Sequence, residues 1–320
     1  MNLRTFPMLI ELDPKTFRHF FPTDPHPFVS GPFITLNQKK ADRIIRLAED
    51  SLKLGMGLVA GVKQGLILSP FSAPFGGFHF KNENLYTGEI DGFLVQLQEY
   101  IVKEGLQGME LTLPPDLYHQ TFNAKMVNAL IRGGFQSELP DITGWIELDQ
   151  FEGSFSYKNS REYYRQALRN GLFFKTVTER EEQNEAYELI RENRARFGRP
   201  IYMTFDDIIH TSELWTTDFF QVTSADHHMV ASGIFYRSHP AIIHALFWGD
   251  NEAGRPLRAM DFLAFNIWSY YKDLGFKYID LGISTESGIP NEGLLRFKES
   301  HNGTSSLKYK FRWYIQGVQN

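Results

Sequence analysis

DGFLVQLQEYIVKEGLQGMEL at residues 91–111 and DFLAFNIWSYYKDLGFKYIDL at residues 261–281 match each other without a gap. In both stretches apolar residues recur every three or four positions, a glycine follows, and a short apolar run comes next. The spacing is typical of an amphipathic helix, and Gly105 and Gly275 fit the left-handed position that ends many helices. The stretches therefore predict a helix–glycine–strand unit that occurs twice, 170 residues apart.

The likeness extends beyond this unit in both directions. Residues 123–131 and 291–299 predict a second short helix, and Trp145 and Trp313 lie in predicted final strands. Upstream of each copy, short apolar runs separated by turn residues predict a meander of antiparallel strands. These runs are residues 58–62 and 66–68 in the first half and 219–222, 229–236 and 241–248 in the second.

The chain of 320 residues is long for one ordinary domain and suits two of about 150 residues. We therefore predict an α/β (α+β) fold of two tandem domains, residues 1–150 and 151–320. Each domain should have a mixed, mostly antiparallel sheet flanked by helices.

Composition excludes several classes of function. A net charge of −5 argues against general nucleic-acid binding, and the lack of cysteine excludes disulfides, thiolate catalysis and cysteine-based zinc sites. No His-x-x-x-His or similar ligand spacing occurs, so we expect no metal. Residues 1–6 lack the apolar core of a signal peptide, and no run approaches the roughly 18 apolar residues of a membrane span. We expect a cytoplasmic protein without a membrane span, and the sequence leaves its oligomeric state open.

Four short motifs carry a resemblance to a known family. They are SAPFGG at residues 72–77, KNSREYYRQA at 158–167, YIDLG at 278–282 and GLLRFK at 293–298. Their order and spacing resemble the FemAB-like transferases, whose two units each have the fold of GNAT acyltransferases. One departure is that residues 299–302 intervene before Gly303, where the family usually continues through glycines. Another is that the second half lacks the long charged helical hairpin of the cell-wall peptidyltransferases.

The resemblance implies an N-acyltransferase that moves an acyl group directly from a thioester to an amine or hydroxyl acceptor. In GNAT enzymes the pantetheine arm of acyl-CoA lies between two diverging strands, and its pyrophosphate lies at a helix N-terminus. Acyl-CoA is thus the expected co-substrate, with no permanently bound cofactor. The acceptor would be a small molecule or a peptidoglycan or polysaccharide precursor.

The loop DNEAGRPLR at residues 250–258 is the candidate for binding the donor's phosphates. Gly254 matches the family's glycine-rich pattern, while Arg255 and Arg258 could supply positive charge; the alternative is a solvated turn with two surface arginines. The corresponding loop of the first half, residues 82–89, has two acids and no arginine. We therefore place an anionic donor in the second half.

Two residues are candidates for catalysis. Asp280 ends the strand expected to diverge, where a carboxylate could accept a proton, or it caps the following loop. His244 lies within a meander strand and is either a buried, hydrogen-bonded side chain or a base in a cleft.

Other residues are candidates for contacting substrates, and each could instead have a purely structural role. Trp248 is a candidate for the donor site because aromatic side chains supply stacking surfaces. The candidates for the acceptor or an anionic group are Tyr236, Lys298, Arg296 and Arg161.

Two alternative functions remain open at this stage. One is a FemAB-type transferase that draws on aminoacyl-tRNA, which the missing helical hairpin disfavours. The other is a non-catalytic binding protein with degenerate clefts, an alternative suggested by Pro256, which replaces the second glycine of the phosphate-binding pattern.

Overall fold

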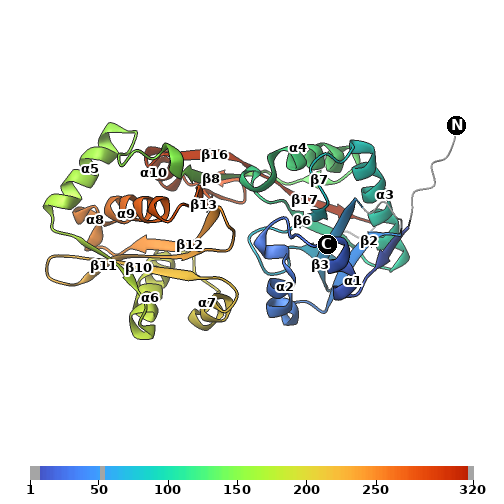
Figure 1. Cartoon of the computed structure of the whole chain (residues 1–320), viewed down its shortest axis with the longest axis horizontal. Helices are drawn as coiled ribbons and strands as arrows, with labels where there is room; N and C mark the ends of the chain where they lie inside the picture. The colour runs from blue at the N-terminus through green and yellow to red at the C-terminus, as the bar shows by residue number, and fades with distance from the viewer. Residues whose placement is uncertain (1–7, 51–54, 316–320) are drawn as a thin grey trace. The chain divides into compact units, whose positions relative to one another are not determined.

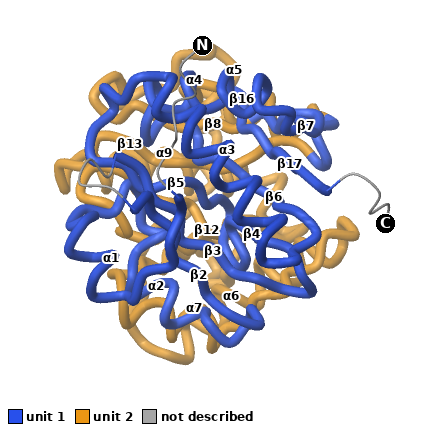
Figure 2. The backbone as a smooth tube through the Cα atoms, turned by 90° about the vertical axis from the view of Figure 1, so that its right-hand side faces the viewer, with its two compact units in different colours: residues 1–142, 286–289, 306–320 blue, residues 143–285, 290–305 orange. Residues whose placement is uncertain are grey.

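The computed structural model describes residues 8–50 and 55–315 of the chain. Residues 1–6, on which the signal-peptide prediction depends, lie outside the described residues. Within the described ranges, no helix has both the length and the apolar character needed to cross a bilayer. The described residues form two compact units (Figure 2): unit 1 is drawn from residues 1–142, 286–289 and 306–320, and unit 2 from residues 143–285 and 290–305.

Unit 1 is built on a mixed sheet with the strand order β1-β2-β3-β4-β6-β17-β7, and β5 also pairs with β3. Helices α3 and α4 lie on one side of it, and α1 and α2 on the other (Figure 1). Its elements, apart from β17, are β1 (Leu9–Glu11), α1 (Pro14–Phe20), η1 (Pro27–Val29), α2 (Gly31–Asn37), η2 (Gln38–Lys40), β2 (Arg43–Glu49), β3 (Met56–Lys63), β4 (Leu66–Ser69), β5 (Phe78–Phe80), α3 (Thr87–Lys103), β6 (Gly108–Thr112), α4 (Asp116–Arg132) and β7 (Gln136–Ser137).

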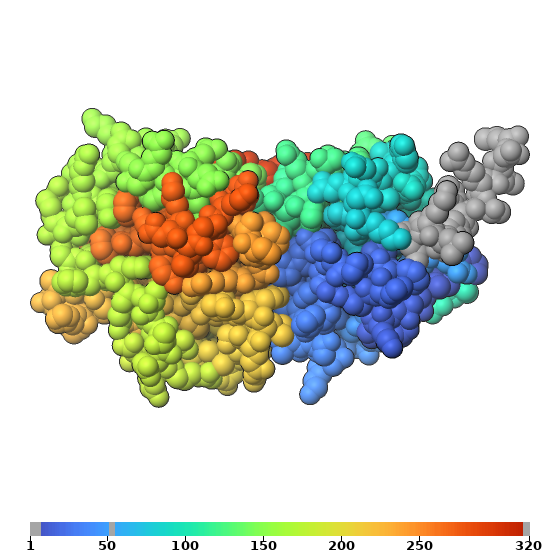
Figure 3. Space-filling model, viewed as in Figure 1, coloured from blue at the N-terminus to red at the C-terminus, as the bar shows by residue number. Residues whose placement is uncertain are grey.

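The sheet of unit 2 has the order β16-β8-β13-β12-β11-β10-β9. Helices α5 and α9 cover one face and α6 and α7 the other (Figure 1). In the same view drawn space-filling, the green and orange residues of the first pair lie above the yellow-green and yellow residues of the second (Figure 3). The remaining elements are β8 (Asp141–Glu147), η3 (Leu148–Gln150), α5 (Lys158–Arg169), β9 (Phe173–Val177), α6 (Arg180–Arg196), α7 (Phe205–Ser212), β10 (Thr217–Thr223), β11 (Met229–Tyr236), β12 (Ile242–Asp250), α8 (Gly254–Leu257), α9 (Ala259–Asp273), β13 (Tyr278–Ile283), β14 (Thr285–Glu286), β15 (Ile289–Pro290), α10 (Glu292–Ser300), β16 (Gly303–Lys308) and β17 (Lys310–Tyr314).

The repeated helix–glycine–strand unit is present in both units, and the predicted fold class is confirmed. Helix α3 is followed by Gly105 at φ +64°, and α9 is followed by Gly275 at φ +82°. Only glycine adopts this left-handed backbone without steric cost, so the chain turns there into β6 and β13. The apolar stripes of both helices are buried against their own sheets.

A side-chain contact of an aspartate in each unit reflects the same repeat. Asp91, in α3, accepts two hydrogen bonds of 2.7 Å from Arg132 at the end of α4. Asp261, in the first turn of α9, lies 3.0 Å from Nε2 of His301, directly after α10. A carboxylate near a helix N-terminus is favoured by the helix dipole. In both units it joins the repeated helix to the helix that follows along the chain, α4 or α10.

The last strand of each half lies in the sheet of the other half. Strand β8, which contains Trp145, pairs with β13 in the second sheet, whereas β17, which contains Trp313, lies between β6 and β7 in the first. The compact units therefore differ from the contiguous domains 1–150 and 151–320 that the repeat predicts. The repeat places Trp145 and Trp313 at equivalent positions, and the two final strands are exchanged.

We expect Phe311→Ala to lower the free energy of unfolding by about 3–5 kcal/mol, because Phe311 of β17 is fully buried in the core of unit 1. Phe173→Ala is the matched control, since Phe173 is 56% exposed on β9 and its loss should cost about 0.5 kcal/mol or less. Urea unfolding followed by circular dichroism measures both variants. Equal effects would contradict the position of β17 inside the first sheet.

Candidate active site

Strands β12 and β13 of unit 2 run parallel and then diverge. Three residue pairs join them, the last being His244 with Asp280, although β12 continues to Asp250 and β13 to Ile283. Directly after this pair, β12 has a bulge at Leu246 against β11, and β13 has one at Leu281 against β8. Because a bulge bends its strand, the two strands separate and leave a gap in the sheet.

The predicted catalytic residues His244 and Asp280 come together where the strands diverge. Nδ1 of His244 lies 3.2 Å from Oδ2 of Asp280, and the backbone N–H of Gly282 donates to Oδ1 of Asp280 at 2.9 Å. Both side chains are buried, at 6% and 1% exposure. A carboxylate in this position orients the imidazole ring and stabilises it when the ring accepts a proton.

Tyr236 extends this pair into a row across three strands. It lies opposite His244 in the register of β11 and β12, so its side chain occupies the same face as those of His244 and Asp280. Burial raises the pKa of the Tyr236 hydroxyl above its ordinary value. The structure thus places Tyr236 beside the dyad, beneath the helices of the α6 and α7 face.

A cavity of about 370 Å³ opens at the diverging ends of β12 and β13. Trp248 of β12 and Lys298 of α10, both predicted site residues, line it. The other residues that line it are Asn193, Arg194, Phe197, Arg199, Leu281, Ile283, Asn291 and Leu294. The size and the mixture of apolar surface with a few polar groups are typical of a small-molecule site.

Lys298 is buried at 3% exposure and lines the cavity. Its Nζ donates to the carbonyl oxygens of Gly282 and Ile283 at 2.9 and 2.8 Å. Those carbonyls belong to the part of β13 that has left β12, so the lysine satisfies acceptors that a ladder would otherwise pair. It also brings a positive charge to the wall of the cavity.

The sequence analysis missed the residues that α6 contributes to the cavity. Arg194 lies in the last turn of α6, with its guanidinium carbon 5.4 Å from the centre of the Phe247 ring. Burial and the nearby charge of Arg199 lower the pKa of Arg194. The sequence feature that could have identified these residues is the basic stretch NRARFGR at residues 193–199, whose glycine predicts the end of a helix.

The predicted phosphate loop has a different arrangement. The N–H of Gly254 donates to Oδ1 of Asn251, and a Cβ at Gly254 would lie 2.4 Å from the backbone oxygen of Val230. Arg258 is directed toward α5, where its guanidinium carbon lies 3.8 Å from the ring centre of Tyr163.

Arg255 lies closer to the cavity than Arg258 does. Its guanidinium carbon is 5.2 Å from the ring centre of Phe197, and Phe197 lines the cavity. Several other predicted residues are not among those that line the cavity, namely His244, Asp280, Tyr236, Arg161 and Arg296. Arg161 donates to the backbone oxygens of Phe155 and Ser156, and Arg296 is exposed on α10. No group of three or more potential metal ligands occurs among the described residues.

The corresponding place in unit 1 is closed. Strand β4 pairs with β6 along its whole length, and Leu68 occupies the register position that His244 has in unit 2. The segment after β4 then continues along β6, since the N–H of Gly76 donates to the carbonyl of Thr112 at 2.9 Å. His26 holds this segment from the other side through Nε2, which is 2.9 Å from the Gly76 oxygen.

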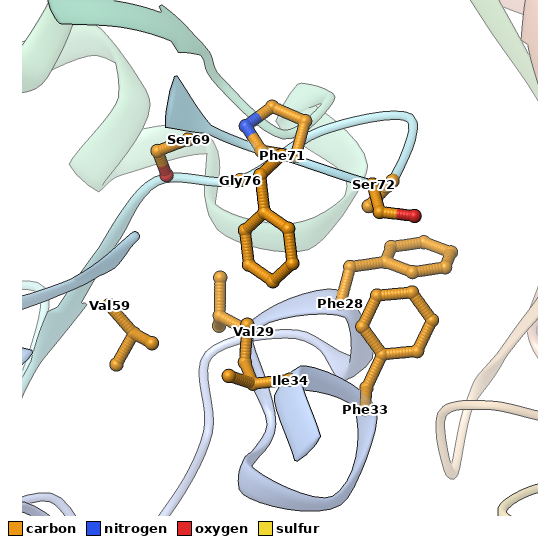
Figure 4. Close-up of a pocket in the computed structure, with 11 residues that line it drawn as sticks. Phe28, Val29, Phe33, Ile34, Val59, Ser69, Phe71, Ser72 and Gly76 are labelled. Carbon is orange, nitrogen blue, oxygen red and sulfur yellow. The ribbon is translucent and has the colours of Figure 1, made fainter. Parts of the chain in front are cut away.

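Figure 4 shows how side chains fill the space beside this segment. Phe28 and Phe33 lie together, with ring centres 5.4 Å apart, and Phe71 points toward Val29 and Ile34. The cavity that remains is about 10 Å³, which is roughly the size of one water molecule. An open gap between diverging strands is thus a property of unit 2.

This pair of sheets matches solved structures over nearly the whole chain. One similar structure is FemX, with a TM-score of 0.67 and 11% identity over 96% of this chain and 97% of that one. Another is a tandem GNAT protein from the clavulanic acid biosynthesis pathway, with a TM-score of 0.57 and 10% identity over 98% of this chain and 99% of that one. The chain has the tandem GNAT fold. L-PGS from Bacillus licheniformis shares this fold, with a TM-score of 0.56 and 15% identity over 97% of this chain and 94% of that one. Neither protein-family models nor curated protein sequences match the chain.

The tandem GNAT fold confirms the predicted resemblance at the level of structure. The diverging strands β12 and β13 are the expected pair, which places the candidate site in unit 2.

We expect His26 to make the free energy of unfolding decrease more steeply as the pH falls than it would without this side chain. Burial lowers the pKa of His26 from 6.5 to about 3, so the folded state excludes a proton that the unfolded chain binds. The contribution is complete above pH 6.5 and is lost as the pH falls toward 3, at about 1.4 kcal/mol per pH unit. Urea unfolding at pH 7, 6 and 5 should give a shallower slope for His26→Gln. The exposed His19→Gln is the control and should keep the wild-type slope.

Proposed function

We propose that unit 2 is an N- or O-acyltransferase that moves an acyl group directly from acyl-CoA to an amine or hydroxyl acceptor. The observation that carries this proposal is the divergence of β12 and β13 directly after His244 and Asp280, with a cavity at the open ends. Facing edges of separated strands present backbone N–H and C=O groups, which an extended ligand with amide groups can pair with. The pantetheine arm of CoA is such a ligand.

The charge of the cavity supports a donor that carries phosphates. Arg194, Arg199 and Lys298 line it, and none of its described lining residues has a carboxylate. A guanidinium group binds phosphate through two parallel hydrogen bonds, which favours arginine at such sites. The chain as a whole has a net charge of −5, so this local excess of positive charge contrasts with the rest of the molecule.

The proposed reaction has one chemical stage and needs no covalent enzyme intermediate. The acceptor nitrogen or oxygen attacks the thioester carbon, the new C–N or C–O bond forms, and the C–S bond breaks to release the CoA thiol. His244, supported by Asp280, accepts the acceptor's proton, directly or through water, and a proton passes to the leaving sulfur. The positive charge of Lys298 stabilises the developing oxyanion.

The acceptor is proposed as a small molecule with a nucleophilic amine or hydroxyl, and precursors of peptidoglycan or polysaccharide belong to this class. Transfer from aminoacyl-tRNA is the alternative. Aminoacyl-tRNA carries its acyl group as an ester, whereas acyl-CoA carries it as a thioester. The acetyl-CoA binding test in the next paragraph distinguishes these two donors.

We expect acetyl-CoA to bind the intact chain with a dissociation constant between about 1 µM and 1 mM, the ordinary range for substrates. Isothermal titration calorimetry measures it. Trp248→Ala should weaken binding at least tenfold, because Trp248 lines the cavity from β12. Trp313→Ala, in unit 1, is the control and should bind as the wild type does. A chain that binds no acetyl-CoA but forms product from an aminoacylated RNA would refute the CoA donor.

We expect Lys298→Met to lower the rate of CoA thiol release from acetyl-CoA by about 10²–10³-fold, as for the loss of one oxyanion-stabilising group. The assay follows free thiol in the presence of a panel of amines and amino sugars. Thermal unfolding of the variant checks that the loss of hydrogen bonds to Gly282 and Ile283 leaves it folded. Arg296→Ala, exposed on the same helix, should retain the wild-type rate; a folded, fully active Lys298→Met would exclude the proposed role.

A further inference from the structure

Helix α5 is attached to unit 2 by one face only. Ser160 and Ala167 are buried, and the ring of Tyr164 stacks on that of Phe265 in α9, with ring centres 3.8 Å apart. Because Ser160, Tyr164 and Ala167 follow one another at intervals of four and three residues, they share one side of the helix. The opposite side is exposed, and we call it the outer face of α5; its residues are Lys158, Glu162, Arg165 and Arg169.

The outer face of α5 is basic. Arg165 and Arg169 are exposed and share a single carboxylate, that of Glu162, at 3.6 and 2.9 Å. Lys158 adds a cation at the start of the helix, and Arg161 beside the face donates to two backbone oxygens of the segment before α5. Four cations against one acid leave the helix positive, whereas the whole chain has a net charge of −5. A local positive field of this kind attracts an extended anionic partner.

Large apolar side chains border the outer face of α5. Tyr157 directly precedes the helix, Leu168 lies in its last turn, and Phe173 begins β9; all three are exposed. Leu168 follows Arg165 by three residues, so these two side chains are neighbours on the helix surface. Cations beside exposed aromatic and aliphatic groups are typical of surfaces that bind at the interface of a lipid bilayer.

The exposed apolar residues of α3 lack this setting. Val95 and Val102 are exposed on one side of α3, but Glu99 lies between them at intervals of four and three residues. An anionic surface would be repelled by that carboxylate. Exposed apolar groups therefore coincide with an excess of cations at α5 and not at α3.

We propose that the outer face of α5 binds the surface of a bilayer that contains anionic phospholipid. The cations of this face contact the lipid phosphate groups, and clusters of about four or more lysines and arginines on a helix suit that role. Tyr157, Leu168 and Phe173 enter the boundary between the headgroups and the acyl chains. An RNA backbone is also polyanionic, but it offers no counterpart to an aliphatic side chain such as Leu168. Such binding is peripheral and does not require the acyltransferase activity proposed above.

The first test measures how the intact chain partitions onto sedimented vesicles. Vesicles of phosphatidylcholine with about 30% phosphatidylglycerol should bind the chain, and pure phosphatidylcholine should bind it far less. Arg165→Gln with Arg169→Gln should lower the partition coefficient about tenfold or more, because each cation near such a surface contributes roughly a factor of five. Lys39→Gln with Lys40→Gln, which removes two exposed cations of η2 in unit 1, is the control and should partition as the wild type does.

The second test asks whether Leu168 enters the bilayer. The chain has no cysteine, so Leu168→Cys can carry a single nitrobenzoxadiazole label. Its emission should shift to the blue and gain intensity when anionic vesicles are added. Val102→Cys is the matched position, because Val102 is 58% exposed on α3 and Leu168 is 53% exposed on α5. The label at residue 102 should show no shift.

Salt should weaken the binding, since it screens the attraction between the cations and the lipid phosphates. Thermal unfolding checks that each variant is folded, and the label at residue 168 tests the surface without removing a charge. The proposal is overturned if anionic vesicles do not bind the wild type, if the η2 variant loses as much binding as the α5 variant, or if both labels shift equally. It is also overturned if an RNA hairpin binds in an Arg165-dependent way and the vesicles do not, because the face would then be a nucleic-acid site.

Discussion

The pair His244–Asp280 is the last point at which β12 and β13 share hydrogen bonds, and the arrangement of the site follows from that limit. A bulge follows in each strand directly beyond this pair, and β13 is then paired with β8 but no longer with β12. A buried polar group without a partner is costly. The side chain of Lys298 donates to two carbonyls in this part of β13. The cavity lies at the diverging ends of the two strands, the His244–Asp280 pair lies where they part, and Lys298 lines the cavity wall.

The two units show how one repeated fold can be open in one copy and closed in the other. In both units an aspartate of the repeated helix contacts a side chain at the end of the next helix. These contacts are Asp91 with Arg132 and Asp261 with His301. They differ at the strand pair: Leu68 replaces the histidine, and β4 stops where β12 continues. In unit 1 the chain after β4 then packs along β6 and fills the gap. The shared contacts maintain the fold, and the differences confine the site to unit 2.

Sequence periodicity predicted the parts of the structure that depend on local rules. The stripes of α3 and α9, the glycines after them and the strands that follow are all consequences of spacing within about 20 residues. The meeting of His244 with Asp280 was not predicted, because it depends on the parallel register of β12 and β13. The roles of Arg194 and Arg199 could not be predicted from the sequence either, because their place at the cavity depends on how far α6 extends along the sheet and on the turn at Gly198. The direction of Arg258 toward Tyr163 is likewise a tertiary contact that no spacing encodes.

The exchange of the final strands also depends on contacts between residues that are distant in sequence, so local spacing did not predict it. The strands that carry Trp145 and Trp313 have alternating apolar and polar residues, and such a strand can pair within either sheet. The alternation therefore does not predict which sheet contains each strand. In the structure β17 lies between β6 and β7, and Phe311 completes the core of unit 1. A chain that ended at residue 150 would therefore expose the edge of β6 and would lack a buried aromatic side chain. Each sheet is completed by a strand from the other half of the sequence. The stability of each half is thus coupled to the other through contacts that are distant in sequence.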